Sequence, residues 1–355
     1  MLFYLRERML MYKIIYGLFY CGIISVANYS FADNLVFYNW DDYISQTVID
    51  QFESETGHTV EVLVFDRDNE RDELIASQAT SGIDLVLMNS ISAKLFGKNN
   101  YLVPITEAFQ NSLDHLDSKW RGSCGQYAMP YLWGTLGIVY RKDKVIPPPT
   151  SWTSLITPIR AHQKHINMQL DLFDTLVPAL KILGLSINTE NIDDLKAAYK
   201  LLVAQKEQVL SYEYVVSYNA RAKNKDRIYL ALAYSGDQLT LENDKSKPQW
   251  DFVVPKEGTA IWIDCIGILS SSTKKKVATA FINFINRPKI AALNAQELWV
   301  ATPNISALQY VSDEFLDDSR VFPSAEMSKK SGLYQVLTNE SIRLRNRIVY
   351  QLEHK

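Results

Sequence analysis

Two aromatic rings and two carboxylates stand within four consecutive residues near the start of the chain: Trp40, Asp41, Asp42 and Tyr43. Ring faces attract cations and cover methylene groups, while carboxylates supply the opposite charge to an ammonium group. Residues 35–39 form an apolar run fit for a buried first strand, so the cluster would lie at a strand end. This chemistry predicts one wall of a site for an organic cation, although such clusters also occur at ordinary strand ends.

An aspartate inside an apolar segment is the second feature with chemical meaning. Residues 260–269 read Ala-Ile-Trp-Ile-Asp-Cys-Ile-Gly-Ile-Leu, which predicts a long buried strand. Asp264 lies two residues after Trp262, so both side chains point to the same face of that strand. A carboxylate there costs free energy unless it has a partner, which can be a backbone donor, a buried arginine or a ligand ammonium group.

Asp171 and Asp174 form a third acidic feature. They follow an expected strand over residues 166–170 and open an expected helix that Gly184 ends. Residues three apart lie on one face of a helix, and acids in a first turn suit the helix dipole. The pair therefore fits either structural capping or a cation site, and the pattern leaves both open.

The order of the expected elements predicts an α/β fold. After the first strand, apolar residues at helical spacing lead into a strand-like alternation over residues 59–65. A charged helix over residues 70–80 and an apolar run over residues 83–88 complete a β-α-β-α-β opening. Ligands of such sheets bind at the carboxyl ends of the strands. Residues 40–43 and 89–92 are therefore expected side by side on one rim.

Further elements are expected later in the chain. Residues 228–234 form a strand that brings Tyr234 to a rim, and residues 274–286 form a helix with a clear apolar face. The charged segment over residues 192–206 is expected as a solvated helix. The tail over residues 333–354 is expected to be helical and basic on one side.

The first residues have the layout of an export signal. Three basic residues precede an apolar run over residues 14–26, and Ser30 and Ala32 occupy the −3 and −1 positions of a cleavage site. This layout predicts a secretory signal peptide over residues 1–32, with an uncleaved membrane anchor as the alternative.

Charge and cysteine content narrow the class of protein. The whole chain has a formal net charge of −3, and loss of the basic signal region makes it more acidic. That balance suits a small cationic ligand and argues against binding of nucleic acid. Cys124 and Cys265 follow the signal peptide, and in an oxidising compartment they either pair or stay separate as buried thiols.

The sequence lacks the motifs of common catalytic sites. It contains no Gly-rich phosphate loop, no Gly-x-Ser-x-Gly elbow and no His-Glu-x-x-His pattern. His162 and His165 are three apart, but no acid or cysteine ligands stand at a spacing that suits a metal. Asp171 and Asp174 on one helix would not flank a glycosidic bond from both sides. We therefore expect no enzyme, no metal ion and no cofactor.

Seven short motifs occur in a fixed order along the chain. They are Val36-Phe37-Tyr38-Asn39-Trp40 with Tyr43, Asp84-Leu85-Val86, Met129-Pro130-Tyr131-Leu132-Trp133-Gly134, Ser151-Trp152, Pro255-Lys256-Glu257-Gly258, Trp262 with Asp264, and Thr302-Pro303-Asn304. Each motif alone is weak. Together they resemble the periplasmic spermidine/putrescine-binding proteins, including the norspermidine-sensing branch, over essentially the whole mature chain.

The resemblance implies an α/β periplasmic-binding-protein fold. Two α/β lobes with central sheets would be joined by a hinge of about three crossings, with the ligand in the cleft between them. Lobe 1 would comprise residues 33–137 and 265–300, and lobe 2 would comprise residues 138–264 and 301–355. The protein would be a monomer in the periplasm that closes around a polyamine.

The resemblance also assigns ligand contacts. The aromatic walls that sandwich the methylene groups would be Trp40, Tyr43, Tyr234 and Trp262. The acids that bind ammonium groups would be Asp264 and the pair Asp171 and Asp174, with Asp42 beside the first ring. The polar contacts would be Asn89 and Gln335.

This chain departs from the family pattern in its lining. Asn89 stands where Ser is usual and Ile91 where Tyr is usual, while Tyr234 replaces a Trp, Asp174 a Glu and Val300 a Tyr. The acidic positions remain, whereas some of the aromatic residues and the length of one acidic side chain differ from the family pattern. The resemblance therefore implies a polyamine ligand and leaves its identity open.

Proteins with this fold serve either transport or signalling. The closed protein either docks on an inner-membrane permease for transport by an ABC transporter, or reports to a membrane receptor that controls cyclic-di-GMP. A binding protein for another cationic solute is the third reading, and an enzyme acting on polyamines is more distant.

Overall fold

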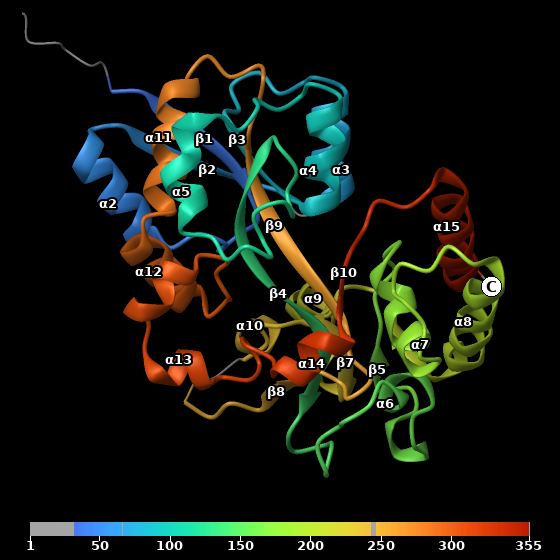
Figure 1. The fold of residues 1–355 in the computed structure, drawn as a ribbon. Helices are drawn as coiled ribbons and strands as arrows, with labels where there is room; N and C mark the ends of the chain where they lie inside the picture. Colours follow the sequence, from blue (N-terminus) through green and yellow to red (C-terminus); the bar gives the residue numbers. More distant parts are fainter. Residues whose placement is uncertain (1–31, 66, 243–245, 355) are drawn as a thin grey trace, which may run out of the picture. The chain divides into compact units, whose positions relative to one another are not determined.

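The computed structural model describes residues 32–65, 67–242 and 246–354 (Figure 1). Residues Asn34–Lys355 form one compact unit. The predicted signal peptide lies outside the described residues, apart from its last position, Ala32. Within the described part of the chain, no helix combines the length and apolar composition that a membrane span requires.

A mixed sheet forms the centre of the unit. Its strands are β1 (Asn34–Asn39), β2 (Thr59–Val64), β3 (Leu85–Asn89), β4 (Ala128–Arg141), β5 (Ile166–Asn167), β6 (Val209–Ser211), β7 (Leu230–Tyr234), β8 (Trp250–Val253), β9 (Ala260–Ile268) and β10 (Gly332–Leu333). The order is β2-β1-β3-β9-β4-β7-β5-β6, with β10 beside β9 and β8 beside β4. β1 is parallel to β2 and β3, whereas β9 is antiparallel to β3 and β4.

Helices cover both faces of the sheet around β1 and β3 (Figure 1). One face packs Leu35, Phe37 and their neighbours against α2, α11 and α12, with Phe37 and Phe52 both in edge contact with Phe281. The other face packs Val86 and Met88 against α3 and α4. Burial on both faces explains the continuous apolar run of β3. These helices are α2 (Gln46–Thr56), α3 (Asp68–Ala76), α4 (Ser90–Lys98), α5 (Gln110–Asp114), α11 (Lys275–Ile285) and α12 (Pro288–Leu298).

A second set of helices packs around β4, β5 and β7. Leu136, Ile138 and Leu232 belong to a core with α6, α7, α8 and α15, while Val139 and Ala231 face a second core with α9. The remaining helices are α6 (Thr153–Ile156), α7 (Val177–Ile182), α8 (Ile192–Gln205), α9 (Val215–Arg221), α10 (Asp237–Thr240), α13 (Asp313–Asp317), α14 (Ala325–Lys330) and α15 (Asn339–His354).

The long strands β4 and β9 are common to both sets of helices. β4 pairs with β9 from Ala128 to Thr135, and its later residues pair with β7 and β8. Cys124, just before β4, forms a disulfide with Cys265 on β9, with the two Cα atoms 5.9 Å apart. In this structure the two cysteines are therefore paired, and both are buried.

Most of the expected elements are confirmed, and several are shorter than expected, among them the strand over residues 166–170 and the tail helix. α2 ends at Gly57, whose φ of 74° is the left-handed conformation that glycine adopts readily. β5 keeps only two residues of the strand expected over 166–170. The tail helix begins at Asn339, because the preceding backbone donates elsewhere: Gln335 N–H to Asn188 and Thr338 N–H to Glu190.

Candidate functional site

Asp264 and Tyr43 form the first half of the candidate site. Asp264 lies on β9 directly opposite Asn89 of β3, and the Tyr43 hydroxyl donates to Asp264 Oδ2 at 3.1 Å. Tyr43 is positioned in turn by Tyr131, whose hydroxyl donates to its carbonyl oxygen. Burial, reinforced by the negative charge of Asp68, raises the pKa of Asp264 to about 7. Among the described residues no Lys, Arg or His forms an ion pair with this carboxyl group, although the charge of Arg71 opposes the shift.

Asp174 forms the second half, and it is only 5% exposed. Its carboxylate accepts hydrogen bonds from the hydroxyls of Tyr234 and Tyr334 and from Gln169 Nε2 at 3.0 Å. Burial, followed by the charge of Asp171, raises the pKa of Asp174 to about 7. Burial likewise raises the pKa of Tyr234 well above its usual value, so this hydroxyl stays a donor.

Asp171 lies beside Asp174 but not on the same helix face, so the expected helical pairing is wrong. Asp171 Oδ1 accepts the backbone N–H groups of Phe173 and Asp174 at 2.7 and 2.8 Å, which fixes a turn before the 3-10 segment Asp174–Leu176. Because these donors occupy its carboxylate, the helix cannot extend back to Asp171. Burial raises the pKa of Asp171 despite the donors.

Trp262 lies between the two acidic groups. It shares β9 with Asp264, and its ring centroid is 6.3 Å from that of Tyr234 in edge contact. Its Nε1 atom is buried without a hydrogen-bond partner among the described residues. Gly134 is its register partner on β4, where a side chain would collide with the indole. The structure thus brings Tyr43, Asp264, Trp262, Tyr234, Asp174 and Asp171 into one region.

The remaining predicted contacts are less central. Trp40 packs on Phe65, with ring centroids 4.4 Å apart, and is half-buried. Asp42 is exposed in a turn, with a φ of 49°. Asn89 caps α4 by accepting from two backbone N–H groups. Gln335 is exposed, whereas its neighbour Tyr334 bonds to Asp174.

Three contributors escaped the sequence reasoning: Asp68, Arg71 and Tyr334. Arg71 is fully buried and pairs with Asp68 and Asp72 at 2.6 Å each. An arginine in the middle of a charged helix gives no sequence signal for burial, since its partners follow only from the packing of α3 on α4. For Tyr334, an aromatic residue beside the predicted Gln335 was the available signal.

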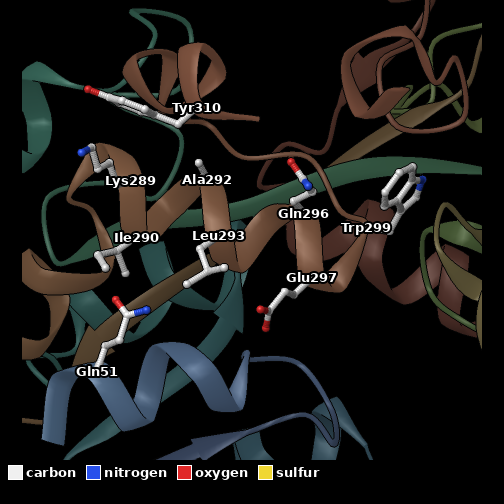
Figure 2. A pocket seen from close by; sticks show the side chains of 9 residues that line it. All are labelled: Gln51, Lys289, Ile290, Ala292, Leu293, Gln296, Glu297, Trp299 and Tyr310. Carbon is white, nitrogen blue, oxygen red and sulfur yellow. The ribbon is translucent and has the colours of Figure 1, made fainter. Parts of the chain in front are cut away.

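A surface groove of about 620 Å³ lies apart from these residues, between α2 and α12 (Figure 2). Gln51, Leu293 and Tyr310 line it, with Lys289 and Glu297 as its charged residues. One carboxylate opposed by one ammonium offers little to a polycation. None of the predicted ligand contacts lines this groove.

Comparisons with known proteins show which family the chain belongs to. The sequence model of the bacterial extracellular solute-binding proteins matches residues 47–323. The chain belongs to this family. The family and its fold are those of solute-binding proteins, which are not enzymes.

Individual members of the solute-binding family show which proteins this chain is similar to. A norspermidine sensor of Vibrio cholerae is 34% identical over 322 residues, which cover 90% of this chain and 89% of the sensor. A putrescine-binding periplasmic protein of Pseudomonas aeruginosa is 32% identical, covering 84% and 86% of the two chains. The solved spermidine/putrescine ABC transporter substrate-binding protein of Streptococcus pneumoniae has a TM-score of 0.78 at 24% identity, covering 91% of this chain and 99% of that one. The expected periplasmic-binding-protein fold is confirmed.

Proposed function

We propose that this chain is a periplasmic polyamine-binding protein that closes around its ligand and presents it to an inner-membrane partner. The observation that carries the proposal is a set of sheltered carboxylates without a cationic partner. Asp171, Asp174 and Asp264 accept hydrogen bonds from hydroxyl, amide and backbone groups, and among the described residues no Lys, Arg or His pairs with them. Buried carboxylates need a counter-charge, and a ligand ammonium group supplies it.

The rings favour a polyamine over a single cation. Trp262 and Tyr234 lie between Asp264 and Asp174, so a ligand that reaches both acids must cross aromatic surface. Methylene groups between two ammonium groups suit that surface, and the rings also attract the charges. Close contacts with the rings would offset the free-energy cost of the torsional freedom that a flexible ligand loses on binding.

Closure would use two lobes, residues 33–137 with 265–300 and residues 138–264 with 301–355. The change of β4 from pairing with β9 to pairing with β7 supports a boundary within β4. Ligand contacts from both lobes would favour the closed form, which is the usual logic of hinged binding proteins. A signal peptide over residues 1–32 would carry the chain to the periplasm. The name of its putrescine-binding relative gives the same compartment.

The partner would be an inner-membrane permease in polyamine ABC transport. The relationship to a norspermidine sensor supports a second candidate, in which the closed protein signals to a membrane receptor with cyclic-di-GMP output. Uptake of labelled polyamine in cells with and without the gene separates the two, because only the transport function requires uptake to fall.

Isothermal titration calorimetry of the mature chain with putrescine, spermidine and norspermidine tests the proposal. We expect saturable binding of at least one polyamine in the micromolar range or tighter, with weaker binding by Asp264→Asn. Absence of heat with all three amines would contradict polyamine binding and favour another cationic solute.

A further inference from the structure

A buried asparagine of α12 lies behind the first half of the candidate site. Asn294 is 2% exposed, and its neighbours Ala291, Ala292 and Ala295 are apolar and buried. A buried amide costs free energy unless its polar atoms have partners, and asparagine is a poor helix former. Packing and helix propensity therefore do not account for this residue, whereas its hydrogen bonds do.

Both ends of the Asn294 side chain have partners. Its Oδ1 atom accepts the backbone N–H of Ser45 at 2.9 Å, and its Nδ2 atom donates to the Tyr131 hydroxyl at 2.9 Å. Because a backbone N–H can only donate, the oxygen must face Ser45 and the amide nitrogen must face Tyr131. Asn294 is therefore a donor toward Tyr131.

This direction fixes the hydroxyl of Tyr131. Since its oxygen accepts from Asn294, its hydrogen is free for the carbonyl oxygen of Tyr43, which lies at 3.0 Å and can only accept. The Tyr43 hydroxyl in turn donates to Asp264 at 3.1 Å. One chain of hydrogen bonds thus leads from α12 to an acid that would bind a ligand ammonium group.

The short segment that carries Tyr43 is held at both ends. Tyr131 donates to the carbonyl of Tyr43, and Asn294 accepts from the backbone of Ser45, two positions later. The rings of Tyr43 and Tyr131 also meet edge to face, with centroids 6.0 Å apart. Ser45 and Tyr131 are both buried, so these hydrogen bonds lie in a low-dielectric interior where a lost partner is costly.

We propose that Asn294 is a positioning residue of the polyamine site, which acts through Tyr131 to aim the Tyr43 hydroxyl at Asp264. This role rests on the proposed function and adds a residue that would not itself touch the ligand. Without the amide donor, the Tyr131 hydroxyl is no longer directed toward the Tyr43 carbonyl, and the segment loses a fixed point. Asp264 would then meet an ammonium group in a less defined geometry.

A purely structural role is the competing explanation. Ser45 is the N-cap of α2, and α12 holds it twice: through Asn294 and through Glu297, which accepts from the Ser45 hydroxyl. If Asn294 only fastens α2 to α12, its loss lowers stability and changes polyamine affinity no more than the loss of Glu297 does. The Tyr131 hydroxyl would then play no part in the effect.

The test measures polyamine affinity by calorimetry in Asn294→Leu, in Tyr131→Phe and in the double variant. Leucine is similar in size to asparagine but forms no side-chain hydrogen bonds, and phenylalanine keeps the ring of Tyr131. For the tightest binder among putrescine, spermidine and norspermidine, we expect each single variant to lose about threefold to tenfold in affinity. The double variant should stay within about twofold of whichever single variant binds more weakly, because both changes break one chain.

Glu297→Ala is the matched control. It removes the other contact between α12 and Ser45, and the hydrogen bonds of Tyr131 stay intact. We expect this variant to melt at a lower temperature and to keep the affinity of the unaltered chain.

The pH profile of binding supplies a readout that a loss of stability does not move. Burial and the charge of Asp68 raise the pKa of Asp264, while the Tyr43 donor and the charge of Arg71 oppose this. If the donor is displaced, the pKa of Asp264 rises further, so the gain of affinity with pH shifts to higher pH. We expect this shift in each of the three variants and not in the control.

The outcomes separate this role from the proposed function. If the unaltered chain binds none of the three polyamines, the proposed function fails and the role of Asn294 fails with it. If it binds one of them and either single variant binds equally well, only the role of Asn294 is wrong. Losses that multiply in the double variant would likewise show that Asn294 acts independently of Tyr131.

A second variant serves if Asn294→Leu fails to fold, which its melting temperature would reveal. Asn294→Asp keeps an acceptor for the Ser45 N–H and loses the donor for Tyr131. Its added negative charge would by itself strengthen binding of a cation, so weaker binding at pH 7.5 would support the positioning role. Equal or tighter binding would overturn it.

Discussion

Tyr43 and Asp264 are 221 positions apart in the chain, yet the hydroxyl of the first donates to the carboxylate of the second. In the sheet only β3 separates β1 from β9, so the Tyr43 side chain in the segment after β1 can reach Asp264 in the middle of β9. A neutral donor lowers the cost of burying a carboxylate, but it brings no charge. Asp264 thus has a hydrogen-bond donor in Tyr43 but no counter-charge from it, a state suited to an incoming cation.

Replacing Asp264 should show its role directly. Asp264→Ala removes the charge that opposes a ligand ammonium, and we expect a loss of about 2–5 kcal/mol in binding free energy, at least tenfold in affinity. Calorimetry with the best polyamine measures this. Asp41→Ala is the control, since Asp41 is exposed in the neighbouring turn. Equal affinities for Asp264→Ala and the unaltered chain would remove Asp264 from the site.

Affinity for a polyamine should rise with pH. The pKa values of Asp264 and Asp174 are raised to about 7 by burial, with Asp68 and Asp171 adding negative charge and Arg71 and the tyrosine donors opposing the shift. Alkylammonium groups keep their protons in this range. Cation binding must then expel protons from these carboxyls at low pH, so we expect affinity to rise about tenfold or more between pH 5.5 and 7.5.

The same shifts should act oppositely on the unliganded fold. Between about pH 4 and pH 7 the folded chain keeps protons on Asp264 and Asp174 that the unfolded chain has lost. These groups therefore lower the free energy of unfolding as pH rises through that window. Calorimetry in buffers of different ionisation enthalpy should detect proton release on binding at pH 6. If binding releases no proton and affinity does not change with pH, the raised pKa values behind both the affinity and the stability predictions are wrong.

Gly134 should be essential for the position of Trp262. A Cβ atom at Gly134 would lie 2.4 Å from Trp262 Cζ2 and 2.4 Å from Ser235 Oγ. We expect Gly134→Ala to displace the indole, to cost about 1–3 kcal/mol of stability and to weaken polyamine binding. Tryptophan fluorescence and calorimetry report the two effects. Gly122→Ala is the control, because nothing lies within 4 Å of its added methyl group; identical behaviour of both variants would contradict the steric argument.

The sequence was most informative where local pattern and fold agree. The apolar run of β9 with one aspartate predicted both a buried strand and a polar site, since burial and chemistry act on the same residues. Asp68 was hidden, because its partner Asn89 is distant in sequence and meets it only once α3 and α4 pack on the sheet. Tyr334 lies in an irregular segment without periodicity, so no pattern could decide between it and Gln335. Asp171 was mistaken for a helical residue because capping and helical acids look alike in sequence.

The disulfide should contribute strongly to stability. It closes a loop with a sequence separation of 141, and such a cross-link restricts the unfolded chain. We expect the double variant Cys124→Ser, Cys265→Ser to lose about 2–5 kcal/mol in free energy of unfolding, measured by guanidinium titration. The unaltered chain should lose a similar amount on reduction, whereas the reductant should leave the double variant unchanged. Cys265 is the residue after Asp264, so the bond also anchors the part of β9 that carries this acid. We therefore expect weaker polyamine binding in the double variant. Equal stability and affinity with and without the bond would show that strand pairing alone fixes β9.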